Sequence, residues 1–570
     1  MLKKSIFAIL LVILFVTVAL SACDIISNNP DRVNALSYEE AVKELGTFLR
    51  TIKVENRPAS LDIYASDRFE GVALADISVF PLSTLGKADI VIEAAVDTEM
   101  SETYFPDDWA NIVAKKFNEQ RLTINGKTVA VSIRTITAGE TLTYQTEAGY
   151  RPDMFIPSSY LFGQMLDASG IETIKIAEKV AGNVAGILMA KKTYDNFITE
   201  YKEVNMANVL AANGKDLNGR VFTFTYTNPF TSSTGFNGVC SILDVYDHDN
   251  PLSATAREKL EAYQRQSPPV GYTTAVLRDK AADGIIDAMV MEYQAWFGKK
   301  DQLKDFAFIP FGVRHDHPVY TYNYVSGEKQ EAVRLFTEYL LKPENQKLAT
   351  DRGFNPAEHE SYSGKTYNLD GAGLLAAQQV WKQSKDGGRP IVAVFVADIS
   401  GSMDGLPLNS LKESLINTSK FIGPNNHIGL VSFSSNVNLN LEIGEFDNTQ
   451  RAYFSGAVKS LSAGGGTATY NAVLVGLDLL LKKKEEVPDA KLMLFVLSDG
   501  KQNEGYNLKR VTPIVGGLQI PIYSIGYNLG NDSSAEGELQ RLSLINEAIL
   551  INATSEDLIN QLRNLFNIQM

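Results

Sequence analysis

Residues 391–402 read Ile-Val-Ala-Val-Phe-Val-Ala-Asp-Ile-Ser-Gly-Ser, and this stretch decides the fold of the C-terminal part of the chain. The continuous apolar run 391–397 is rich in β-branched residues, which is typical of a strand buried on both faces. The D-x-S-x-S loop 398–402 follows directly at the carboxyl end of this strand. In open α/β sheets this is the edge where ligands bind, so the stretch predicts a central strand that carries a polar loop at the functional edge.

Apolar strands and amphipathic helices alternate from this strand to the C-terminus. Strand patterns occupy residues 427–433, 437–443, 491–497, 520–525 and 548–551, and helical spacing occupies 411–422, 470–484 and 555–566. Strands without polar alternation, separated by helices, need cover on both faces. We therefore predict a Rossmann-like α/β domain over residues 391–570, with a mostly parallel central sheet flanked by helices.

Two more polar loops are expected at the same edge of this sheet. Gly464-Gly465-Gly466-Thr467 opens a helix, and the strand that ends at Leu497 leads into Ser498-Asp499-Gly500. A single loop of Asp, Ser and Gly is usually only a turn. Three such loops at one edge bring two carboxylates and three hydroxyls together, and Mg²⁺ prefers about six oxygen ligands and readily keeps waters among them. The sequence thus predicts a divalent-cation site with an open coordination position.

With these motifs in this order, residues 391–570 resemble the von Willebrand factor A domain. The resemblance implies a metal-ion-dependent adhesion site, and its ligands would be Asp398, Ser400, Ser402, Thr467 and Asp499. The hydroxyls would bind the ion directly, and the two carboxylates directly or through water. The implied cofactor is Mg²⁺, with Mn²⁺ or Ca²⁺ as alternatives, and the open position would accept a Glu or Asp of a protein partner. A hydrolytic metal site would need a placed base, so we expect no enzyme.

A second α/β region is predicted over residues 87–365. Its strands are expected at 89–96, 128–136, 153–156, 184–189 and 285–293, and its helices at 109–119 and 328–341. Scattered segments, among them 96–101, 152–159, 226–235 and 339–356, resemble bacterial extracellular solute-binding proteins of the two-lobed, type II periplasmic kind. The resemblance is nearest to the molybdate-like and phosphate-like branches, and it implies two lobes that close over a ligand by hinge motion.

Candidate ligand-binding residues in this region are hydroxyl and amide side chains near strand ends and helix starts. Hydroxyls beside unpaired amide groups can hold an anion or a polar ligand, although the same residues are also ordinary helix caps. The candidates are Ser101, Ser158, Ser159, Asn183, Ser232, Ser233, Thr234 and Tyr293. The pair of histidines in His315-Asp316-His317 has no third ligand in the sequence nearby, so we interpret that segment as a polar loop.

The N-terminus predicts export and a lipid anchor. Residues 1–22 form a secretory signal pattern, and Leu20-Ser21-Ala22-Cys23 resembles a bacterial lipobox, in which the thiol of Cys23 receives a diacylglycerol. An uncleaved membrane helix is the alternative, although the segment is short for spanning a bilayer. Lipidation of Cys23 leaves Cys240 alone, which predicts a buried small hydrophobe. Residues 23–86 are expected to form a tether and an N-terminal segment with a helix at 38–50.

Charge and turn composition complete the prediction. The net charge of −14 over 570 residues, without clustered Lys and Arg, excludes a nucleic-acid-binding surface. Turn residues near position 388 predict a linker over 366–390. We expect a lipid-anchored protein on the extracytoplasmic face of the cell membrane, with a small polar or anionic ligand in the middle domain and a protein partner at the cation. The alternative is the receptor of an ABC-type importer, with the C-terminal domain as a docking or regulatory module.

Overall fold

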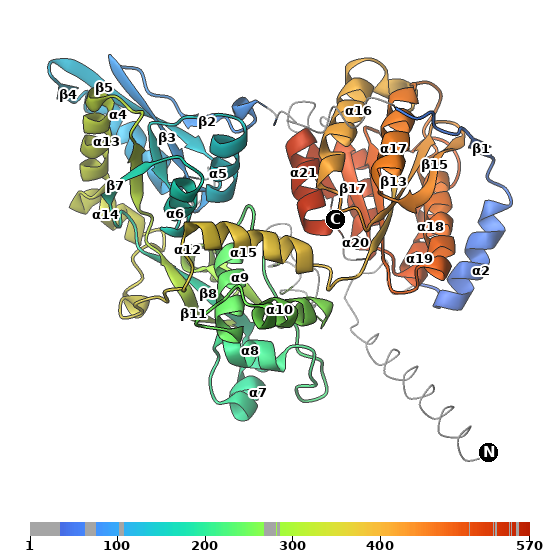
Figure 1. Cartoon of the computed structure of the whole chain (residues 1–570), viewed down its shortest axis with the longest axis horizontal. Helices are drawn as coiled ribbons and strands as arrows, with labels where there is room; N and C mark the ends of the chain where they lie inside the picture. The colour runs from blue at the N-terminus through green and yellow to red at the C-terminus, as the bar shows by residue number, and fades with distance from the viewer. Residues whose placement is uncertain are drawn as a thin grey trace.

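A computed structural model shows two bodies (Figure 1). It describes residues 35–62, 74, 76–101, 108–266, 277, 281, 286–500, 502–527, 529, 533–546, 548, 550–553 and 558–570. The predicted signal peptide, Cys23 and the start of the tether lie outside the described residues. None of the described helices combines the length and the apolarity that crossing a bilayer requires.

The C-terminal body is built on a seven-stranded sheet of order β1-β15-β14-β13-β16-β17-β18. Its strands are β13 (Ile391–Asp398), β14 (His427–Phe433), β15 (Val437–Glu445), β16 (Lys491–Ser498), β17 (Ile522–Tyr527) and β18 (Leu550–Ala553), with β1 added at one edge. All neighbouring pairs run parallel except β14 and β15. This confirms the predicted mostly parallel sheet.

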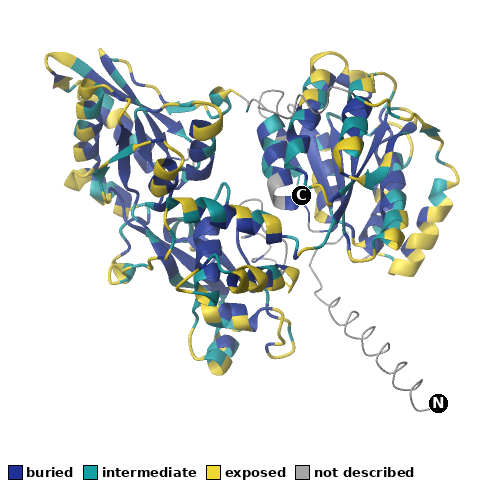
Figure 2. Cartoon of the chain, viewed as in Figure 1, coloured by how far each residue is buried: buried dark blue, intermediate teal, exposed yellow. Residues whose placement is uncertain are grey.

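Helices cover both faces of this sheet. Every residue of the central strand β13 is therefore buried. Alternate side chains of β13, such as Phe395, contact α16 (Leu406–Thr418), α17 (Asn448–Ser460) and α21 (Leu558–Gln569) on one face. The others, such as Val394, contact α18 (Thr469–Glu486), α19 (Leu508–Leu518) and α20 (Ser533–Leu544). Figure 2 shows the resulting buried core between two helical layers.

The N-terminal residues 35–62 are part of this C-terminal body. Helix α2 (Tyr38–Leu49) begins with a capping box between Ser37 and Glu40 and packs on α18 and α19. Strand β1 (Val54–Asn56) then pairs in parallel with the edge strand β15, with Val54 opposite Val437. An added strand satisfies backbone groups that an edge would leave exposed. The middle domain is therefore inserted between two pieces of the C-terminal one.

Truncating Leu45 tests whether α2 is an integral part of this body. The side chain is 2% exposed in the core with α18 and α19, so Leu45→Ala is expected to lower the free energy of unfolding of the C-terminal body by about 2–4 kcal/mol. The control Val42→Ala lies on the same helix at 39% exposure and should cost much less. Denaturant unfolding of the full chain measures both, and equal small effects would contradict the packing.

The middle body consists of two lobes, as predicted. The first lobe has a sheet of order β2-β5-β3-β6-β12-β7, and the second has a sheet of order β11-β8-β10-β9. Their strands are β2 (Leu82–Thr84), β3 (Ile90–Val96), β5 (Lys127–Thr135), β6 (Met154–Ile156), β7 (Thr173–Ala177), β8 (Asn183–Ala190), β9 (Phe224–Thr225), β10 (Ala288–Glu292), β11 (Phe306–His315) and β12 (Val319–Tyr322). The chain crosses between the lobes from β7 to β8 and from β11 to β12, which defines the hinge.

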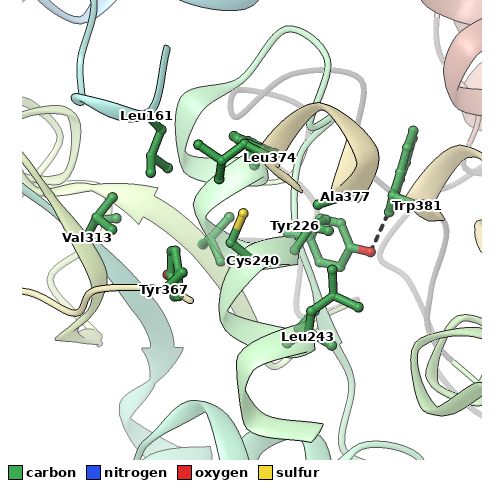
Figure 3. Close-up of a cluster of buried hydrophobic side chains, with 14 of the residues drawn as sticks. Leu161, Tyr226, Cys240, Leu243, Val313, Tyr367, Leu374, Ala377 and Trp381 are labelled. Carbon is green, nitrogen blue, oxygen red and sulfur yellow. Dashed lines mark hydrogen bonds between the residues drawn. The ribbon is translucent and has the colours of Figure 1, made fainter. Parts of the chain in front are cut away.

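The core of the second lobe includes Cys240 and a helix from the predicted linker (Figure 3). Cys240 on α9 (Ser233–Tyr246) is free and fully buried, which confirms its role as a small hydrophobe. Helix α15 (Gly371–Ser384) buries Leu374 and Trp381 in the same core, and the Trp381 Nε1 donates to the Tyr226 hydroxyl at 3.0 Å. Residues 371–384 thus belong to the middle body, and 385–390 lead from it to β13.

Candidate functional site

The carboxyl end of β13 places Asp398 at the centre of a hydrogen-bonded set of oxygens. One of its carboxylate oxygens, Oδ1, accepts from the Ser400 amide at 2.8 Å, and the other, Oδ2, accepts from the Ser498 hydroxyl at 2.6 Å. The hydroxyls of Ser400 and Ser402 lie 3.1 Å apart, and Ser402 Oγ donates to Asp499 Oδ1 at 2.9 Å. Four of the five predicted ligands therefore form one continuous chain of contacts.

Thr467 lies in a loop that is fixed against the Asp398 loop by backbone hydrogen bonds. The Gly401 amide donates to the Gly465 carbonyl at 3.0 Å, and the Gly464 amide donates to the Ile399 carbonyl at 2.8 Å. Gly465 has a φ of +90°, a conformation that favours glycine. The loop therefore brings Thr467 to the same edge of the sheet, where its amide donates to Asn503 Oδ1 at 2.8 Å.

The charges of this site suit a cation. Burial raises the pKa of Asp398 to about 6, and burial also raises the pKa of Asp499. A carboxylate with a raised pKa is destabilised in its charged form, and a nearby cation removes that cost. Within the described residues no group of three or more His, Cys, Asp and Glu is arranged around a metal position. The donor set here is instead two carboxylates with hydroxyls, all oxygen, which fits Mg²⁺ and leaves coordination positions open.

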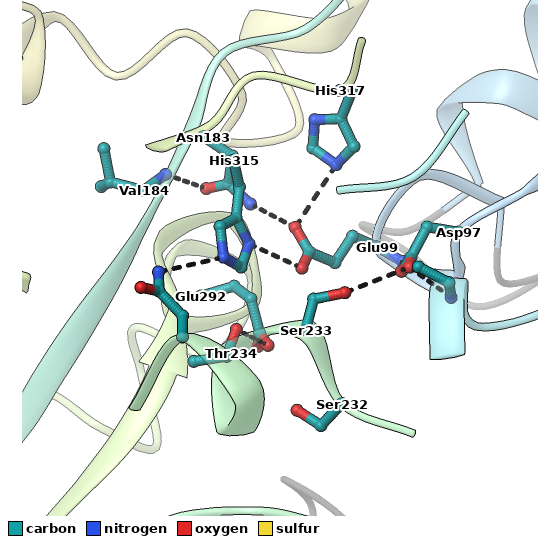
Figure 4. A network of polar contacts seen from close by, with 12 residues as sticks. Asp97, Glu99, Asn183, Val184, Ser232, Ser233, Thr234, Glu292, His315 and His317 are labelled. Atoms are coloured by element: carbon teal, nitrogen blue, oxygen red, sulfur yellow. Dashed lines mark hydrogen bonds and ion pairs between the residues drawn. The ribbon is translucent and has the colours of Figure 1, made fainter. Parts of the chain in front are cut away.

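A second polar cluster lies between the two lobes of the middle body (Figure 4). Glu99, from the first lobe, accepts from Asn183 Nδ2 at 3.0 Å, lies 2.9 Å from His315 Nδ1 and lies 3.3 Å from His317 Nε2. Asp97 lies 3.5 Å from the Ser233 hydroxyl of the second lobe. We call this set the interlobe cluster; it comprises Asp97, Glu99, Asn183, Ser233, Thr234, Glu292, His315 and His317.

Charge is unevenly distributed in the interlobe cluster. Burial opposes ionisation of Glu99, but the charges and hydrogen bonds of His315 and His317 hold its pKa well below the usual range. Burial and the charge of Glu99 raise the pKa of Glu292 to about 7 and that of Asp97 to about 6. Glu292 accepts a short hydrogen bond from Thr234. The cluster therefore disfavours additional negative charge.

The candidate ligand-binding residues separate into two groups. Asn183, Ser233 and Thr234 belong to the interlobe cluster. The others make local contacts: Ser101 donates to the backbone carbonyls of 96 and 97, Ser232 caps α9, and Tyr293 bonds to Glu358. Ser158 and Ser159 are buried after β6, where the Ser158 carbonyl accepts from the His317 amide at 3.0 Å. The Ser158 hydroxyl has no hydrogen-bond partner among the residues that the structure describes.

The segment His315-Asp316-His317 ends β11 and leads into the connection to β12, so a loop was correctly predicted there, but its burial and its carboxylate partner were not. Both histidines are fully buried at the hinge and contact one carboxylate. Their shared partner, Glu99, lies 216 residues away from His315 in the chain, so no local pattern pointed to it. The alternation of the two histidines, which puts them on one face of an extended segment, was the available signal.

The structure thus comprises a two-lobed domain and a Rossmann-like domain with a set of polar loops at the carboxyl edge of its sheet. The profile of the von Willebrand factor type A domain matches residues 393–565, and that of the bacterial extracellular solute-binding proteins matches residues 108–355. The chain therefore combines a bacterial extracellular solute-binding domain with a von Willebrand factor type A domain.

Individual relatives match one domain each. The inter-alpha-trypsin inhibitor heavy chain H1 of Sus scrofa is 28% identical over 170 residues, which is 27% of this chain and only 18% of that protein. Iron-bound HitA from Pseudomonas aeruginosa covers 52% of this chain and 99% of its own at 15% identity and a TM-score of 0.37. The von Willebrand factor type A structure from Catenulispora acidiphila covers 31% of this chain and 42% of its own at 19% identity and a TM-score of 0.28.

Proposed function

We propose that the protein is a lipid-anchored binding protein of the cell envelope whose C-terminal domain binds Mg²⁺ and, through it, a carboxylate of a protein partner. The observation that carries the proposal is the unbroken series of hydrogen bonds from Ser498 through Asp398, Ser400 and Ser402 to Asp499. The ion would supply a positive charge and an open coordination position. Asp398, Ser400, Ser402, Thr467 and Asp499 would hold it.

The roles of these side chains follow from their surroundings. Asp398 is fully buried and fixed by two donors, so it would orient the loop, whereas Ser402 is exposed and lies on the side from which a partner approaches. In the present structure the Ser402 hydroxyl proton bridges to Asp499. A bound cation would interact with the Asp499 carboxylate in place of this hydrogen bond. The Ser402 hydroxyl oxygen would then be available as a ligand of the ion.

The proposed anchor at Cys23 lies close in sequence to the adhesion domain. Tyr38, the first residue of α2, follows Cys23 by 15 residues and already belongs to the C-terminal body. A stretch of that length spans at most about 50 Å when extended. The domain that carries the metal site would therefore be the body held nearest to the membrane, so a partner in the same envelope is within reach.

The middle domain is proposed to bind a small polar ligand between its lobes. Groups from both lobes meet in the interlobe cluster, and Glu99 must leave His315 and His317 before anything can enter. Because the cluster carries three buried carboxylates, a neutral or cationic polar molecule fits it better than the anionic ligand considered from the sequence. If this domain delivers its ligand to a permease, the protein is instead the receptor of an importer.

Thermal melting of the full chain tests both proposals. A ligand that binds only the native state stabilises it by about 2.7 kcal/mol at a hundredfold excess over Kd. We expect Mg²⁺ to raise the melting temperature and EDTA to reverse the rise. A panel of sugars, amines, amino acids and oxyanions is screened in parallel. No effect of Mg²⁺ would refute the metal site, and stabilisation by a panel member would support the middle domain as a solute receptor.

A further inference from the structure

A separate cavity lies at the opposite end of the C-terminal sheet from the metal centre. Its volume is about 440 Å³, and it is lined where β16 and β17 begin, by Lys491, Leu492 and Pro521. Asp398 and Asp499 lie at the carboxyl ends of the strands, so this cavity cannot be part of their site. We call it the basal pocket. The connection 385–390, α2 and α10 (Ala254–Gln266) also contribute to its wall.

The charged lining of the basal pocket is mainly positive. Lys385, Arg389, Lys484 and Lys491 face it, with Asp386 as the one carboxylate among its described lining residues. Asp386 is already paired, because Lys385 Nζ lies 2.6 Å and Lys491 Nζ 3.3 Å from its carboxylate. Four positive side chains and one carboxylate leave a surplus of three positive charges, two of which lie on Arg389 and Lys484.

Arg389 and Lys484 are the two positive side chains of the pocket that do not contact the Asp386 carboxylate in the described structure. Arg389 Nε has a weak contact of 3.4 Å to the Asp386 carbonyl, and Lys484 Nζ donates to the Ala490 carbonyl at 2.5 Å. Neither forms an ion pair with a carboxylate of the described residues, although the charge of Asp489 acts on Lys484 from farther away. Burial lowers the pKa of Lys484 and of Lys491, so both charged forms lack full solvation. A bound anion would offset that loss.

The rest of the wall combines the side-chain amides of Gln264, Gln519 and Gln569 with apolar side chains, and its apolar part limits what the anion can be. Leu481, Leu492 and Ile520 are among the lining residues. A volume of this size lies within the range of small-molecule sites, about 300–1,000 Å³, whereas a bare inorganic anion would leave most of it unfilled. An arginine beside a lysine suits a phosphate group, because the guanidinium can bind two of its oxygens at once.

We propose that the basal pocket binds a phosphate ester that carries an apolar organic group, with the phosphate between Arg389 and Lys484. Two sources share this chemistry: the headgroup region of a membrane phospholipid and a soluble phosphate ester. The lipid source has a geometric basis, because Tyr38 lines the pocket and follows the predicted anchor residue Cys23 by 15 residues. The proposal does not depend on the metal site.

Calorimetric titration of the full chain in neutral detergent tests the proposal with defined probes. Phenyl phosphate represents the soluble source and dihexanoylphosphatidylglycerol the lipid source. Two control compounds carry one part each: inorganic phosphate has the anionic group alone, and benzyl alcohol has the apolar group alone. We expect phenyl phosphate, the phospholipid or both to bind clearly more tightly than inorganic phosphate and benzyl alcohol. Arg389→Gln and Lys484→Gln should each weaken that binding by about tenfold, as expected for a charge-assisted hydrogen bond.

The matched control is Lys482→Gln, which lies on α18 two residues before Lys484. Lys482 is 69% exposed, pairs with Asp478 at 2.7 Å and does not line the pocket, so its loss should leave binding unchanged within about twofold. Binding of phenyl phosphate alone assigns a soluble ester, and binding of the lipid alone assigns a headgroup. No binding of either probe, or an equal loss in Lys482→Gln, overturns the proposal. Melting curves of all three variants verify that they fold.

Discussion

Replacing Asp398 by alanine is expected to abolish Mg²⁺ binding by the full chain. The substitution removes the carboxylate that both positions the Ser400 amide and accepts from Ser498, so the loop loses its charge and its geometry together. Magnesium needs near-ideal octahedral placement of its oxygens and tolerates such a loss poorly. Calorimetric titration with Mg²⁺ and the Mg²⁺-induced rise in melting temperature should both fall to background, and binding of a partner carboxylate should disappear with them.

Two further variants distinguish loss of the metal from loss of the fold. Asp404→Ala removes an exposed carboxylate six residues farther along the same loop region and should leave Mg²⁺ affinity unchanged. Asp499→Asn keeps the shape of a partly exposed ligand but removes its charge, so it should weaken binding with little effect on stability. Unaltered Mg²⁺ binding in Asp398→Ala would refute the assignment of the site.

The sequence was sufficient for the C-terminal sheet because its strands are nearly pure apolar runs. The predicted limits 427–433 match β14, and the run 391–397 falls one residue short of β13, which includes Asp398. The carboxyl ends of parallel strands meet at one edge of a sheet. The sequence therefore predicted that the loops after β13 and β16 lie close together. The two lobes of the middle body were instead implied by the resemblance of its scattered segments to two-lobed solute-binding proteins.

Features that depend on distant segments could not be predicted. Strand β1 is three residues long and has no alternation of its own; it forms because β15 offers an open edge. Helix α19 contains Pro513, which argues against a helix when only the sequence is read. The contact between Glu99 and the hinge histidines joins segments more than 200 residues apart. In each case the decisive partner is supplied by the tertiary structure.

Helix α21 of the C-terminal body contacts both lobes of the middle body. Arg563 forms a short, buried ion pair with Glu140, in the first turn of α5 (Ala138–Glu147) of the first lobe. Asn564 Nδ2 also donates to Glu140 at 2.8 Å. On the second lobe, Lys382 of α15 donates to the Phe566 carbonyl at 3.1 Å. These contacts tie the metal-binding domain to the domain that would bind a solute.

Removing Glu140 is expected to be the most destabilising single change at this interface. In Glu140→Ala the Arg563 guanidinium stays buried without its counter-charge, which costs about 3–5 kcal/mol. Glu140→Met combined with Arg563→Met removes both charges and should recover most of that loss, because the paired charges gain little over apolar groups of similar size. Denaturant unfolding of the full chain gives the three free energies.

The control for this cycle is Glu147→Ala, which removes an exposed carboxylate at the other end of α5. It should change the free energy of unfolding by less than about 0.5 kcal/mol. The double variant matters most, since recovery in it shows that the cost of Glu140→Ala comes from an unpaired charge and not from damage to α5. If Glu140→Ala costs no more than Glu147→Ala, Arg563 must already be solvated, and this ion pair then contributes little to holding the two bodies together.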